Sequence, residues 1–132
     1  MANENLKLRT KQFALRIIRL VENLPEKTTS KIIGAQILRS ATSVAANYRA
    51  GCLAKSKRDF INKLKNVEEE TDETMFWLEL LEESGMFPQN KLLPLKTEAH
   101  EILTIIIASI KTARKNQKNN SKITNKSPNN PT

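Results

Sequence analysis

The chain of 132 residues is poor in several residue types, and each shortage excludes a class of protein. Three glycines, four phenylalanines, one tryptophan and one tyrosine are too few for a β-barrel or β-sandwich, which need frequent turns and β-favouring side chains. The single cysteine, Cys52, forms no internal disulfide, as is usual in a reducing compartment. The longest apolar run, residues 105–108, is far shorter than the roughly 18 residues of a membrane span, and no segment resembles a signal peptide. We therefore expect a cytoplasmic protein with no membrane contact.

The residues that catalysis and metal binding require are also scarce. The one histidine, His100, cannot complete a carboxylate-bridged di-iron site, which takes a histidine from each of two helices. Cys52 has no general base assembled around it, and no glycine-rich phosphate loop occurs. The sequence therefore predicts a protein that is not an enzyme and that holds no metal and no cofactor.

Positive charge, in contrast, is plentiful: 22 lysines and arginines stand against 14 acids. The excess is concentrated in residues 111–132, which hold six bases and no acid. Asn, Ser, Thr and Pro fill the rest of this segment, so it cannot bury enough apolar surface to offset the entropy of ordering. We expect residues 1–115 to form one domain and residues 116–132 to be a disordered, basic, Asn-rich tail.

Apolar residues recur at helical spacing in four segments, near residues 5–24, 31–52, 57–83 and 90–115. Pro25, Gly51 and Gly85 mark the ends of the first three, and Thr29 or Ser30 is the expected cap of the second. Short connections between four helices predict an all-α fold, an antiparallel up-down-up-down four-helix bundle. The third segment has the clearest seam, with spacings of four and three along Phe60, Leu64, Val67, Thr71, Thr74, Leu78 and Leu81.

Some apolar side chains fall outside these stripes. A bundle buries only one face of each surface helix, so such residues indicate a second contact surface. We therefore predict self-association through an oligomer interface that includes Phe76, Leu103, Ile105 and Ile107.

The third predicted helix changes the sign of its charge halfway along. Residues 55–65 hold five bases and one acid, whereas residues 68–83 hold eight acids and no base. Acids are favoured at a helix N-terminus and bases at the C-terminus, so this order opposes the helix dipole. We therefore expect the charges to face a partner outside their own helix. One interpretation of the bases is that they bind phosphates at a helix N-terminus. The alternative is that they form a solvated helix end and pair with acids of a neighbouring helix or subunit. The acids predict pairing with another subunit or with Arg16 and Arg19 of the first helix, unless those two bases belong to a solvated face. The predicted nucleic-acid-binding residues are Arg49, Lys55, Lys57, Arg58, Lys63, Lys65, Lys111, Arg114, Lys115 and Lys118.

Three segments carry a family resemblance: LRSATSVAANYRAG at 38–51, KSKRDFINKL at 55–64 and WLELLEESG at 77–85. With them, roughly residues 8–112 resemble the bacterial four helix bundle protein family. Its founding members are encoded by intervening sequences in large-subunit ribosomal RNA genes, and it includes the accessory variability determinant of diversity-generating retroelements. Ala50 stands where members commonly carry Glu, which is typical of a distinct subgroup.

The resemblance implies a homopentameric, barrel-like assembly without enzymatic activity. For the retroelement branch it implies a basic surface that associates with RNA or DNA and with a reverse transcriptase. Together with the charges, it favours a non-enzymatic, homo-oligomeric accessory protein that binds nucleic acid. The alternative is a protein–protein scaffold with no nucleic-acid role, in which the apolar fourth helix and Phe76 contact a different protein.

Overall fold

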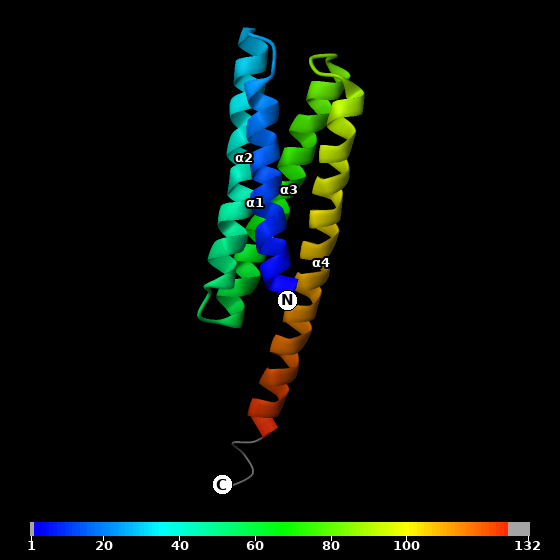
Figure 1. Cartoon of the computed structure of the whole chain (residues 1–132). Coiled ribbons are helices and arrows are strands. Elements are labelled where there is room, and N and C mark those ends of the chain that lie inside the picture. The colour runs from blue at the N-terminus through cyan, green and yellow to red at the C-terminus, as the bar shows by residue number, and fades with distance from the viewer. Residues whose placement is uncertain (1, 127–132) are drawn as a thin grey trace.

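The computed structural model describes the backbone of residues 2–126 and the side chains of residues 5–119, and in that range the chain forms four helices and no strand. Successive helices run antiparallel, so that α1 and α3 point up and α2 and α4 point down in Figure 1. Helices α1 and α3 each pack on α2 and α4 and lie on a diagonal of the bundle. The predicted all-α four-helix bundle is confirmed. The helices span Ala2–Glu22 (α1), Thr28–Cys52 (α2), Lys57–Glu83 (α3) and Gln89–Lys126 (α4).

The apolar stripes of the sequence form the core. In α4 every residue of the predicted stripe is buried, from Leu92 to Ala113, and in α3 the stripe is buried from Leu64 to Leu81. Ile61 takes the buried place at the start of α3, whereas Phe60 is half-buried. In α2 the buried seam passes through small and polar residues that the apolar pattern does not reveal, namely Ser30, Gly34, Ser40 and Gly51 beside Ile37, Ala41, Val44 and Tyr48.

Helices α2 and α3 make the closest contact of the bundle, and small side chains permit it. Ser40 and Thr74 are fully buried, and the Thr74 hydroxyl donates to the Ser40 Oγ over 2.8 Å. Ser40 in turn donates to the Ile37 carbonyl over 3.2 Å, so the buried hydroxyls are satisfied. At Gly51 a Cβ would lie 3.3 Å from the Lys63 Cβ, closer than side chains usually approach. A larger residue there would separate the two helices just above their connecting turn.

The ends of α2 and α3 follow local chemistry. Ser56 caps α3, since its Oγ accepts the Asp59 backbone N–H over 3.1 Å. At the other end Gly85 has a φ of 72°, and the Met86 N–H reaches back to the Leu81 carbonyl over 3.1 Å, which closes α3 with a Schellman turn. The prediction that Thr29 or Ser30 caps α2 is wrong. Helix α2 begins one turn earlier, with Lys27 at the cap position, because the Ser30 side chain is turned into the bundle and buried.

Helix α4 is longer than the sequence predicted. Its expected end near Lys115 is wrong, since the helix continues to Lys126 and projects below the rest of the bundle in Figure 1. The segment after Lys115 contains Lys, Gln and Asn but no glycine or proline before Pro128, so no residue in it breaks a helix. The predicted disorder of residues 127–132 lies outside the described residues.

Candidate nucleic-acid interface

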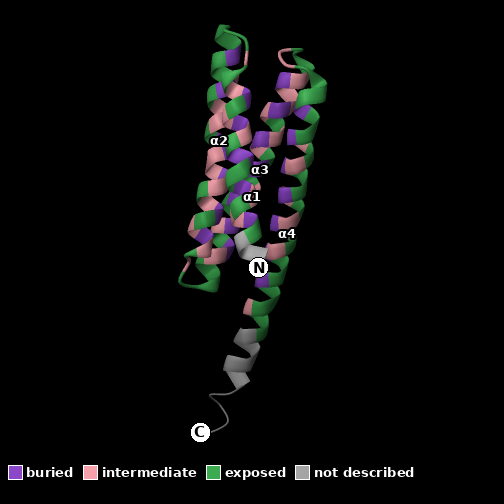
Figure 2. Ribbon diagram, viewed as in Figure 1, coloured by how far each residue is buried: buried purple, intermediate pink, exposed green. Residues whose placement is uncertain are grey.

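The connection between α2 and α3 forms a basic elbow at the lower end of the bundle (Figure 2). Lys55, Lys57 and Arg58 are exposed there, around the turn that Ser56 closes. A hollow of about 380 Å³ lies inside the elbow, bordered by Lys55 and Lys57 and floored by Phe60. The N-terminus of α3 opens at this point, and a helix N-terminus favours anions. The elbow therefore presents positive side chains around a helix end that attracts negative charge.

The fold brings the elbow beside the lower part of α4. A second hollow, of about 330 Å³, separates Lys57 and Phe60 from the α4 face between Ile105 and Asn116. Phe60 borders both hollows, so the elbow and α4 form one continuous surface. The two basic segments are far apart in the sequence, and the descent of α4 past the start of α3 brings them together (Figure 1).

We call this surface the basic end and define it by ten bases. Against these bases the same segments, 49–65 and 105–119, hold one acid, Asp59, so their net charge of +9 exceeds the +8 of the whole chain. Lys63 is half-buried, and the other nine are exposed. None of the ten forms an ion pair with a side chain that the structure describes. The structure thus places the predicted nucleic-acid-binding residues at one end of the molecule: Arg49, Lys55, Lys57, Arg58, Lys63, Lys65, Lys111, Arg114, Lys115 and Lys118.

The acidic half of α3 is partly neutralised within the bundle. Arg39 of α2 binds two of its carboxylates, Glu70 over 3.0 Å and Glu73. Lys96 of α4 binds Glu82 over 2.6 Å, and the hydrogen bond and charge of that carboxylate raise the pKa of Lys96. The other five acids, Glu68, Glu69, Asp72, Glu79 and Glu83, form no ion pair with a described side chain.

Helix α1 does not take part in this neutralisation, so the predicted pairing of Arg16 and Arg19 with the α3 acids is wrong. Helices α1 and α3 lie on a diagonal, and in the described range no Cα atom of one lies within 8 Å of a Cα atom of the other. In α1, Arg9 binds Glu98 of α4 through Nε at 3.1 Å and Nη2 at 2.6 Å. The hydrogen bond to Glu98 raises the pKa of Arg9.

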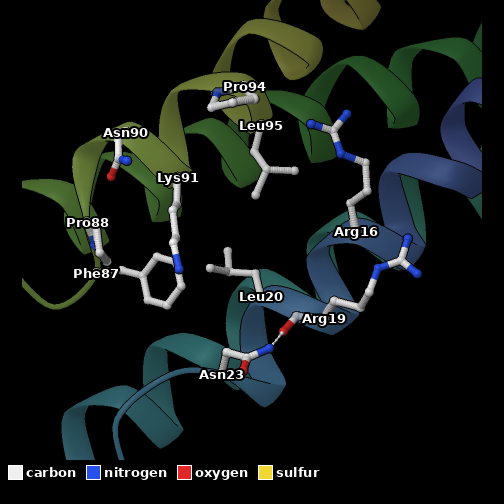
Figure 3. Close-up of a pocket in the computed structure, with 10 residues that line it drawn as sticks. All are labelled: Arg16, Arg19, Leu20, Asn23, Phe87, Pro88, Asn90, Lys91, Pro94 and Leu95. Carbon is white, nitrogen blue, oxygen red and sulfur yellow. Dashed lines mark hydrogen bonds between the residues drawn. The ribbon is translucent and has the colours of Figure 1, made fainter.

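No pattern in the sequence indicates the groove that lies at the opposite end of the molecule. Between the second half of α1 and the start of α4 lies an open groove of about 740 Å³ (Figure 3), which we call the upper groove. Three bases border it, and none of the residues that line it is acidic. Its bases come from distant parts of the sequence, so only the packing of α1 beside α4 brings them together. The lining residues used below are Arg16, Arg19, Leu20, Phe87, Lys91 and Leu95.

The residues predicted for an oligomer interface differ in exposure. Phe76 is 50% exposed, which is high for an aromatic side chain in a small bundle. Leu103, Ile105 and Ile107 are half-buried. Ile105 packs against the core and also borders the second hollow, the one between Phe60 and α4. Their role in an interface stays a prediction.

Within the described residues no cluster of three or more His, Cys, Asp or Glu side chains could hold a metal ion. In the same range no helix is both long and apolar enough to cross a membrane. His100 is exposed and Cys52 is half-buried, its thiol beside the elbow hollow.

Comparisons with known proteins show which family has this sequence and architecture. The family described as 23S rRNA-intervening sequence protein matches residues 5–108. A crystal structure of a protein of unknown function from the S23 ribosomal protein family, from Bacteroides thetaiotaomicron, is similar with a TM-score of 0.79. That protein is 35% identical, and the match covers 84% of this chain and 99% of its own. A search of curated proteins finds no match. The family match confirms the resemblance drawn from the sequence motifs.

Proposed function

We propose a function from the premise that this chain belongs to the 23S rRNA-intervening sequence protein family. It acts in the cytoplasm as a non-enzymatic, homo-oligomeric accessory protein that binds RNA or DNA through the basic end. The observation that carries this proposal is that the two segments that meet at the lower end of the bundle hold ten bases and one acid. Because none of those bases forms an ion pair with a described side chain, their charge is available to phosphates.

The surface suits the phosphate backbone better than the bases of a nucleic acid. Binding of single strands usually stacks bases on exposed aromatic side chains. At the basic end Tyr48 is buried and Phe60 is half-buried between two hollows. Phosphate contacts position a nucleic acid without reading its sequence, so we expect weak sequence preference.

Self-association would strengthen such binding. A ring of protomers repeats the basic end once per copy, and summed charge raises the local potential that a polyanion meets. The resemblance implies five copies. It also implies a reverse transcriptase partner in the retroelement branch, which a reverse transcriptase gene with template and variable repeats nearby in the genome would support.

The test is fluorescence anisotropy with labelled RNA and DNA over a series of salt concentrations. The variant Lys55→Glu/Lys57→Glu removes two bases of the elbow, and acids near the start of α3 do not weaken the helix. Each lost phosphate contact lowers the slope of log affinity against log salt by about 0.9 on duplex DNA, so the slope should fall by about two. Affinity at low salt should fall at least about tenfold.

Lys27→Glu/Lys31→Glu is the matched control, because it changes the same charge at the start of α2, at the other end of the bundle. The control should bind as the wild type does. Equal losses in the two variants would mean that net charge alone attracts the nucleic acid. If the wild type binds neither RNA nor DNA at low salt, the proposal fails and the scaffold alternative is favoured.

A further inference from the structure

The upper groove is a basic surface whose charges form no ion pair with any side chain that the structure describes. Arg9, Arg39 and Lys96 are each held by a carboxylate of a neighbouring helix. In contrast, Arg16, Arg19 and Lys91 form no ion pair with a described side chain, although all three border the groove. The positive charge of the groove is therefore available to the acidic groups of a partner.

Between those bases the groove is apolar. Figure 3 shows Leu20 of α1 and Leu95 of α4 facing each other across its centre, with the Phe87 ring at one side. Lys91 extends from α4 toward Phe87, and Arg16 extends from α1 toward α4. The groove can thus hold an apolar side chain that carries negative groups around it, and its volume is in the range of binding sites.

The outer face of α3 presents such a side chain. Phe76 is half-exposed, and the positions four residues before it, three residues after it and one heptad to either side are acidic, so we call this face the acidic stripe. None of the acids of the stripe forms an ion pair with a described side chain, although Glu79 and Glu83 are near enough to raise the pKa of Lys96. The stripe consists of Glu69, Asp72, Phe76, Glu79 and Glu83.

The bundle holds Phe76 in place. Its ring packs edge-on against Trp77, with centroids 5.0 Å apart and an interplanar angle of 66°. The Trp77 Nε1 donates to Glu73 over 3.0 Å, and Glu73 binds Arg39 of α2. An aromatic side chain that is already ordered loses little entropy when it is buried by a partner.

We infer that the upper groove of one copy receives Phe76 and the acidic stripe of a second copy. This inference rests on the self-association in the proposed function and assigns its two surfaces. The positive rim meets the negative stripe, and the apolar centre of the groove takes the phenylalanine ring. The partner therefore contributes the residue that fills the groove.

The placement of the two surfaces determines the kind of assembly. The groove lies between α1 and α4, whereas the stripe lies on α3, diagonally across from α1. Two different surfaces make a heterologous contact, which repeats from copy to copy and either closes into a ring or extends as a filament. Both surfaces lie in the upper half of the bundle, so parallel copies standing side by side bring them to the same level (Figure 1). Such an arrangement leads to a ring with all basic ends on one side.

Charge reversal tests this pairing. The groove variant is Arg16→Glu/Arg19→Glu, and the stripe variant is Asp72→Lys/Glu79→Lys; all four side chains are exposed or half-buried. Each double variant sets like charges opposite each other and should raise the dissociation constant of the assembly at least about tenfold. The quadruple variant reverses both surfaces, restores attraction and should assemble as the wild type does. Sedimentation velocity gives the masses, and circular dichroism verifies that each variant is helical.

Phe76→Ala is a second probe, because truncation of a half-exposed side chain leaves the core intact. It should weaken assembly by about tenfold or more if the ring fills a pocket of the partner. Double variants that assemble like the wild type, a folded quadruple variant that remains monomeric, or a monomeric wild type would each overturn the inference. Nucleic-acid anisotropy is measured separately, so loss of binding at the basic end with intact assembly would contradict the proposed function and leave this inference standing.

Discussion

The two helix pairs α2–α3 and α1–α4 are built from different side chains and have different consequences. Helices α2 and α3 approach closely because Ser40, Ala41 and Gly51 take up little space, and a buried hydrogen bond joins them. The stripes of α1 and α4 carry larger residues such as Phe13 and Ile102, and their backbones are farther apart. The distance between two packed helices follows the size of the side chains at the contact. The close pair, α2–α3, therefore contributes specific packing, and the wider pair, α1–α4, leaves the upper groove open.

The largest expected effect would separate the close pair. Ser40→Leu places a branched side chain where Ser40 is fully buried, and it removes one acceptor of the Thr74 hydroxyl. The Thr74 hydroxyl keeps the Glu70 carbonyl as an acceptor over 2.8 Å, so overpacking alone should lower the free energy of unfolding by about 2 kcal/mol. Urea denaturation followed by circular dichroism measures this loss.

The matched change at the wider pair is Asn90→Leu, which adds a leucine to the border of the upper groove. Because the groove has room and Asn90 is exposed, the free energy of unfolding should change by no more than about 0.5 kcal/mol. Similar losses for the two variants would show that the helix pairs do not differ in their tolerance of volume.

An intermediate effect is expected where one ion pair ties the wider pair together. Arg9 meets Glu98 through two nitrogens, and both side chains are mostly shielded, with 26% and 18% exposed. Arg9→Met keeps an unbranched apolar stem and removes the charged guanidinium group. It should cost about 1 kcal/mol, the upper end for such pairs, because the geometry is bidentate.

A double-mutant cycle with Glu98→Gln isolates this interaction. Arg39→Met, which acts at the close pair, serves as the comparison and should cost less, since Arg39 is 47% exposed and its helices are joined by packing. If Arg39→Met lowers the free energy of unfolding more than Arg9→Met does, the ion pair matters more at α2–α3 than at α1–α4, contrary to this prediction.

The fold was predictable to the extent that burial follows apolar periodicity. The stripes of α3 and α4 were found because leucines and isoleucines mark them. The α2 seam passes through Gly34, which an apolar pattern does not mark, since glycine carries no hydrophobic signal even where its lack of a side chain is what allows burial. The end of α4 was missed for the opposite reason: a polar sequence suggested disorder, although it contains no residue that stops a helix before Pro128.

The candidate site was predictable only where it is continuous in sequence. The elbow bases were found from a run of charge between Lys55 and Lys65. The partners of Arg39 and Lys96, and the presence of Lys91 and Arg16 on one groove, depend on which helices are neighbours and on their relative heights. A sequence pattern gives the faces of helices, but it does not give the levels at which long side chains meet.

The smallest expected effect concerns the ion pair of the close helices and appears mainly in acid. The Trp77 Nε1 donates to the Glu73 carboxylate over 3.0 Å and lowers its pKa, and Arg39 lowers it further, against a partial burial that raises it. A carboxyl group whose pKa is lower in the folded chain stabilises folding above its unfolded pKa, about 4.3 for Glu, and loses this contribution as the pH falls through the folded value. Glu73→Gln keeps an oxygen that can accept from Trp77 and removes the charge.

At pH 7 this variant should be less stable by only about 0.3 kcal/mol, because exposed pairs are screened by water. Below about pH 4.3 the wild type should lose that advantage, so that the two unfolding free energies converge as the solution is acidified. Glu69→Gln removes the same charge from a carboxylate that has no ion-pair partner among the described side chains, and at pH 7 it should be as stable as the wild type. If Glu73→Gln and the wild type stay equally far apart from pH 7 to pH 3, the charge of Glu73 contributes nothing to the close pair. The α2–α3 contact would then rest on its small residues and buried hydroxyls alone.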